Sequence, residues 1–107
     1  MITVLVVSEA GRARDLDEAA ARMPSLELLH ANDVEQALDR LARNRRIDAV
    51  LLLLDPESAS EIAKVVLEED PGAPPLVVAG SDVPGTRRLA SAEPAPLLES
   101  LERILAG

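Results

Sequence analysis

Residues 47–54 read Ile-Asp-Ala-Val-Leu-Leu-Leu-Leu and contain the longest apolar run of this chain of 107 residues. Six consecutive aliphatic residues, followed by the turn-forming pair Asp55-Pro56, are typical of a strand that helices cover on both faces. The run is far too short to span a bilayer. We therefore place residues 47–54 at the centre of a parallel sheet.

The rest of the chain alternates between short aliphatic runs and stretches in which apolar residues recur every three or four positions. Strands are predicted at 2–7, 26–30, 76–79 and, weakly, 88–91; helices are predicted at 10–23, 34–41, 58–69 and 97–105. Asn32 with Glu35, and Ser58 with Glu61, have the spacing of capping boxes at the starts of the second and third helices.

This alternation predicts an α/β fold of three layers, in which a doubly wound parallel sheet of five strands has the order 2-1-3-4-5. The length suits one domain, residues 1–107, and the sequence shows neither an internal repeat nor a linker. Residues 80–96 contain Pro84-Gly85 and Pro94 but no amphipathic run long enough for a full helix. We expect the fourth helix of such a fold to be missing or reduced to one turn.

Composition excludes several classes of function. The chain lacks cysteine, so it has neither disulfides nor thiolate metal sites, and its net charge of −8 disfavours nucleic-acid binding. It also lacks aromatic residues, which removes base stacking and aromatic interface anchors. Without a membrane segment or a secretory signal, the expected location is the cytoplasm.

The crevice beyond the carboxyl ends of the first and third strands is the expected ligand position, because the strand order reverses there. Ser8 and Glu9 follow the first strand, and residues 53–55 close the third. Acidic side chains on both sides of such a crevice, here Glu9 and Asp55, are what a Mg²⁺-dependent phosphoryl acceptor needs.

Four segments resemble the receiver domain of bacterial response regulators, which has a flavodoxin-like fold. They are residues 4–9 (Val-Leu-Val-Val-Ser-Glu), 48–53 (Asp-Ala-Val-Leu-Leu-Leu), 75–80 (Pro-Leu-Val-Val-Ala-Gly) and the pair Glu93-Pro94. The resemblance covers nearly the whole chain. It implies two-component signal transduction, with an acidic pair after the first strand, a phosphoaccepting Asp ending the third, a Thr or Ser ending the fourth and a Lys before the last helix.

The departures from this pattern predict a vestigial acid pocket with no catalytic residue and no cofactor. The acceptor position falls on Leu53, and Ser8 replaces the first acid while Glu9 keeps the second. Gly80 stands at the Thr/Ser position, and Glu93 replaces the Lys, where it would repel phosphate. The family's aromatic switch cannot exist in a chain without aromatic residues.

The leading hypothesis is a non-catalytic pseudo-receiver that binds a protein partner, or forms a homodimer, through the region preceding the last helix. Loss of a helix there is expected to expose aliphatic sheet surface, which then needs a partner. No contact with nucleic acid or membrane is expected. His30, the single histidine, has no evident catalytic partner.

Two alternatives stay open. Asp55 lies two residues beyond Leu53, so it is the candidate for a phosphoacceptor that uses Glu9 and Mg²⁺. The competing interpretation is that Asp55 caps the following helix. A small-ligand binder that uses the same crevice is the third possibility.

Overall fold

The computed structural model describes residues 2–8, 14–43, 46–69, 74–79, 86–89 and 94–106. The elements, in chain order, are β1 (Ile2–Ser8), α1 (Arg14–Ala20), β2 (Leu26–Ala31), α2 (Val34–Arg43), β3 (Ala49–Leu53), α3 (Pro56–Glu69), β4 (Leu76–Ala79), β5 (Arg87–Leu89) and α4 (Pro94–Ala106). Strands and helices thus follow one another as the hydrophobic pattern predicts.

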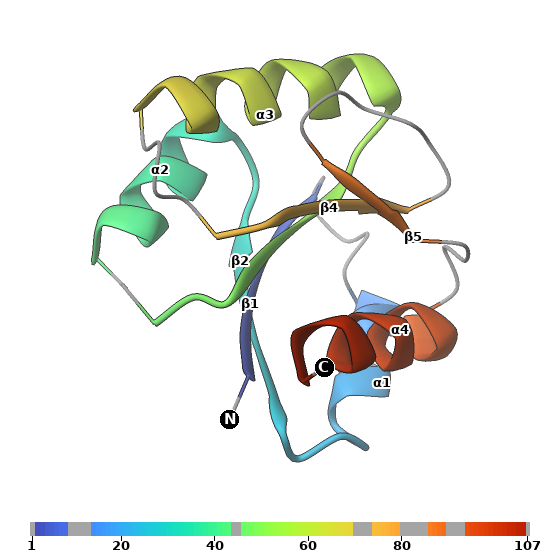
Figure 1. Cartoon of the computed structure of the whole chain (residues 1–107). Helices are drawn as coiled ribbons and strands as arrows, with labels where there is room; N and C mark the ends of the chain where they lie inside the picture. Colours follow the sequence, from blue (N-terminus) through green and yellow to red (C-terminus); the bar gives the residue numbers. More distant parts are fainter. Residues whose placement is uncertain are drawn as a thin grey trace.

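The five strands form one parallel sheet in the order β2-β1-β3-β4-β5, which confirms the predicted topology. Helices α2 and α3 lie on one face of this sheet, and α1 and α4 lie on the other (Figure 1). The strand order reverses between β1 and β3, and the carboxyl ends of these two neighbouring strands lie where the sequence predicts a ligand.

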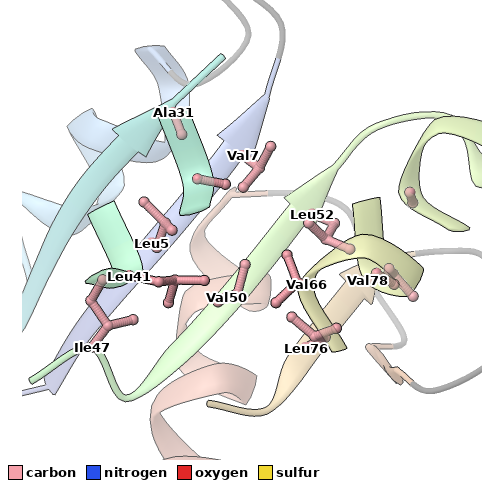
Figure 2. Close-up of a cluster of buried hydrophobic side chains, with 13 residues drawn as sticks. Leu5, Val7, Ala31, Leu41, Ile47, Val50, Leu52, Val66, Leu76 and Val78 are labelled. Atoms are coloured by element: carbon pink, nitrogen blue, oxygen red, sulfur yellow. The ribbon is translucent and has the colours of Figure 1, made fainter. Parts of the chain in front are cut away.

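The side chains of alternate strand residues pack into two separate apolar cores, one on each face of the sheet. Leu5, Val50 and Val78 point to the α2/α3 face, where Val66 of α3 joins them (Figure 2). Their neighbours along the strands point to the α1/α4 face and pack with Leu97, Leu98 and Leu101 of α4. Because β1 and β3 are covered on both sides, these strands are aliphatic without polar alternation.

The two predicted capping boxes are wrong in position. In α2 the cap is Asp33, whose Oδ1 accepts from the Gln36 N–H (2.8 Å), while the Gln36 side chain accepts from the Asn32 N–H (2.8 Å). Helix α3 begins at Pro56, two residues before Ser58, because proline suits the first helical position. The predicted Asn32–Glu35 and Ser58–Glu61 pairs therefore do not start these helices.

The expectation of a missing or shortened fourth helix is confirmed, since the described part of the chain has four helices and residues 80–86 alone connect β4 to β5. A crossover between parallel strands usually takes a dozen or more residues. The predicted consequence is wrong for the described residues, however. Leu76 and Val78, on the α2/α3 face, are only 3% and 2% exposed, because α3 packs in the same core.

Candidate functional site

Ser8 and Leu53 are register partners at the carboxyl ends of β1 and β3. Ser8 is buried, with 3% of its surface exposed, whereas Leu53 is half-buried and packs against the core on the α1/α4 face. The structure therefore brings the residue at the first acidic position beside the residue at the acceptor position. Neither side chain carries a carboxylate, and Leu53 offers no nucleophile.

Asp55 begins α3 as its N-cap. Its Oδ2 accepts a hydrogen bond from the Ser58 N–H (3.0 Å), and its backbone C=O accepts from the Ala59 N–H (2.9 Å). The Ser58 N–H, followed by the Ser58 hydroxyl, holds the pKa of Asp55 below its ordinary value. The capping interpretation of Asp55 is thus confirmed, and the carboxylate is solvent-exposed.

The other predicted pocket residues, Glu9, Gly80 and Glu93, lie outside the described residues. At the described positions, Ser8 and Leu53 offer Mg²⁺ no carboxylate, and the one carboxylate, that of Asp55, accepts a hydrogen bond from the Ser58 N–H. Elsewhere in the described ranges, no three His, Cys, Asp or Glu side chains gather closely enough to hold a metal ion.

His30 has a partner that sequence reasoning missed. Its Nε2 lies 2.8 Å from Asp17 Oδ1, so the end of β2 is tied to α1 across the surface. The two residues are 13 positions apart, on a helix and the strand that follows it, and only the packing of α1 on β2 brings them together. The pair is partly exposed, with 38% and 54% of the side-chain surfaces accessible, which suits a surface contact between two elements.

The predicted contact region before the last helix is described only at residues 86–89. Within it, Arg87 and Arg88 are exposed, and Leu89 is buried against α4. Because Arg88 is the register partner of Val78, it belongs to the α2/α3 face. Among the described residues of β4 and β5, the exposed side chains are therefore charged rather than aliphatic. Over the described ranges, no helix is long and apolar enough to cross a membrane.

Comparison with protein-family models gives no match, and neither does comparison with the sequences of curated proteins. Similar solved structures do exist. A putative response regulator from Chloroflexus aurantiacus is 22% identical, with a TM-score of 0.72 and coverage of 99% of this chain and 98% of that one. The pseudo-receiver domain of the CikA protein is 19% identical, with a TM-score of 0.66 over 99% and 97%.

A third similar structure comes from the complex of the phosphorylated P1 domain of CheA3 with CheY6 of R. sphaeroides. It is 18% identical, with a TM-score of 0.71 over 99% of this chain and 98% of that chain. All three comparisons extend over essentially the full length of the chain. The chain has the fold of the response-regulator receiver domain.

Proposed function

We propose that this chain is a non-catalytic pseudo-receiver of a bacterial two-component-type system, which signals through contact with a protein partner and not through phosphorylation of an aspartate. The observation that carries the proposal is the pairing of Ser8 with Leu53. An aliphatic side chain at the end of β3, packed against the core, leaves the acceptor position without an oxygen to phosphorylate.

Three further features support the loss of phosphoryl chemistry. Asp55 is engaged as the N-cap of α3, so its carboxylate has a structural role. The sequence has Gly80 where a hydroxyl is expected and Glu93 where a Lys is expected, so these positions offer phosphate neither a side-chain hydroxyl nor a positive charge. The aromatic switch is impossible in a chain without aromatic residues.

Contact with a protein partner fits the remaining properties of the domain. One structural neighbour comes from a complex with the phosphorylated P1 domain of CheA3, and another is itself a pseudo-receiver. The exposed Arg87 on β5 offers charge to a partner near the region that precedes α4. Without aromatic anchors such a contact relies on aliphatic and charged groups, and we expect it to be weak and transient.

An NMR titration of the backbone amides tests the proposal, first with millimolar Mg²⁺ and then with beryllofluoride, which mimics a phosphoryl group. We expect no saturable shifts at Ser8, Leu53 or Ser58. Saturable shifts clustered there would overturn the proposal in favour of phosphorylation on Asp55 with Glu9 and Mg²⁺. The variant Asp55→Asn is the control, because it abolishes shifts that depend on the Asp55 carboxylate while keeping a capping side chain.

A further inference from the structure

The two outer strands of the sheet differ in how well their edges are protected. Strand β5 has only three residues and carries exposed Arg87 and Arg88. Short strands and charged side chains both discourage an edge from pairing with another chain. Strand β2, from Leu26 to Ala31, is twice as long, contains no proline, and carries one exposed charged side chain, Glu27, where β5 carries two in half the length. The β2 edge is therefore the open edge of the sheet.

The outward-facing backbone groups of β2 follow from one hydrogen bond. The Ser25 C=O accepts a hydrogen bond from the Ile2 N–H (2.8 Å). The backbone groups of Ser25 and of every second residue after it therefore point toward β1. The backbone N–H and C=O groups of Leu26, Leu28 and His30 then point outward, away from β1. The Leu26 N–H donates to the Met23 C=O (3.0 Å), but within the described residues the backbone groups of Leu28 and His30 have no partner on this side.

The helices beside β2 extend away from its open edge. Helix α1 contacts β2 and α4, and α2 contacts β2, β1 and α3, so both helices also reach inward over the sheet. On the α1 face the His30 side chain is held by Asp17. The side chains of Leu28 and Leu29 are both half-buried, although the strand is at the edge. The edge thus combines unpaired backbone groups with apolar side chains.

We propose that the β2 edge is the pairing site for a second copy of this chain, whose own β2 adds in antiparallel direction across a two-fold axis. Such an axis runs perpendicular to the sheet, so each face of one copy continues into the same face of the second copy. Residues that lie opposite each other across the two β2 strands must therefore have side chains on the same face. Leu28 and His30 satisfy this condition. When Leu28 opposes His30 of the second copy, each chain donates two backbone hydrogen bonds and accepts two.

Charge and side-chain chemistry favour this register. It sets Leu29 against Leu29 of the second copy at the axis, and apolar cross-strand pairs stabilise a sheet. Glu27 then opposes Ala31, so the two Glu27 carboxylates stay well separated. Moving the axis to Leu28 would bring these carboxylates closer together, which costs free energy in a chain whose net charge is already −8. The surface lies at the opposite edge from β5, and this inference stands whether or not the acid pocket functions.

Sedimentation analysis across a range of concentrations tests the pairing with two variants of one residue. His30→Pro removes the outward N–H, while His30→Ala removes the imidazole and keeps that N–H. We expect the unmodified chain and His30→Ala to dimerise alike. His30→Pro should weaken the dimer by about tenfold or more, because two-fold symmetry removes two hydrogen bonds at once. Dimers unaffected by His30→Pro, or a chain that stays monomeric at millimolar concentration, would overturn the proposal.

Amide hydrogen exchange of the unmodified chain provides a second test, which does not depend on whether His30→Pro folds. The Leu28 and His30 amides should become protected as the concentration rises. The Glu27 and Leu29 amides, which face β1, should be protected at every concentration. Exchange at Leu28 and His30 that is independent of concentration would exclude the β2 edge as the interface.

Discussion

Thr3 and Asp48 are joined by two hydrogen bonds at the start of the β1–β3 ladder. The Thr3 N–H donates to Asp48 Oδ2 (2.8 Å), and the Asp48 N–H donates to the Thr3 C=O (2.7 Å). Thr3 is buried, with 7% of its surface exposed. This pair helps to fix the register that, five residues further along both strands, brings Ser8 opposite Leu53.

Replacing Asp48 by alanine should destabilise the fold, because the Thr3 N–H loses its acceptor in a buried position. We expect a loss of about 1–3 kcal/mol in the free energy of unfolding, measured by urea denaturation. Asp48→Asn keeps a side-chain oxygen and should lose clearly less. If the two variants were equally stable, the Thr3–Asp48 hydrogen bond would make no net contribution.

Asp55 gives a prediction about stability and pH. Its pKa in the folded chain lies below the ordinary value of 3.8, because the Ser58 N–H and hydroxyl favour the charged carboxylate. The stabilisation is therefore fully present above pH 3.8 and is lost as the pH falls through the lower, folded-state pKa. At neutral pH we expect Asp55→Ala to unfold at a lower urea concentration than Asp55→Asn, since Asn also caps helices.

Stability measured at acid pH separates the contribution of the Asp55 charge from that of its capping hydrogen bond. The unmodified chain should be more stable than Asp55→Asn at pH 7, and this difference should shrink as the pH drops below 3.8. A difference that stayed constant down to pH 2 would show that the charged carboxylate contributes nothing beyond its capping hydrogen bond. Thermal unfolding followed by circular dichroism provides the measurement.

Strand β5 should depend on one side chain for its attachment. Leu89 is 3% exposed and packs with the leucines of α4, whereas Arg87 on the same strand is exposed. Leu89→Ala should cost about 2–5 kcal/mol, because it leaves a cavity in the core. Arg87→Ala should change the free energy of unfolding by no more than about 0.5 kcal/mol. Similar losses for both variants, again measured in urea, would argue against an anchoring role for Leu89.

Much of the fold could be predicted because the central strands β1, β3 and β4 are largely aliphatic on both faces and the strand–helix alternation permits few topologies. The helix starts could not, because Asn32 and Asp33 both have capping side chains and only the backbone path selects Asp33. The Thr3–Asp48 and Asp17–His30 contacts depend on packing between separate elements, which local periodicity does not report.

For the described residues of β4, the prediction of exposed aliphatic surface is wrong for a related reason. The sequence shows that the connection between β4 and β5 is short, but not that α3 packs in the same core as Leu76 and Val78. For the candidate site, the resemblance identified Ser8 and Leu53, which the structure describes, whereas Glu9, Gly80 and Glu93 lie outside the described residues. Their pairing follows from the parallel register of β1 and β3.

Restoring a carboxylate at the acceptor position tests whether the crevice is a vestige of a Mg²⁺ site. In Leu53→Asp the new carboxylate would lie beside Ser8, which Glu9 follows in the sequence. We expect this variant to be less stable than the unmodified chain without metal, because the position is half-buried against apolar side chains. Added Mg²⁺ should then recover about 1.4 kcal/mol at ten times its dissociation constant.

The matched control for this variant is Leu54→Asp, which introduces the same charge one residue further on, at a position that packs against the core on the α2/α3 face. Mg²⁺ should not stabilise it, and should not stabilise the unmodified chain, as thermal unfolding with and without the metal would show. Stabilisation of Leu53→Asp alone would mean that the acceptor position retains the surroundings of a cation site and lacks only its carboxylate. Equal stabilisation of all three proteins would instead indicate that carboxylates already present bind Mg²⁺, which contradicts the non-catalytic assignment.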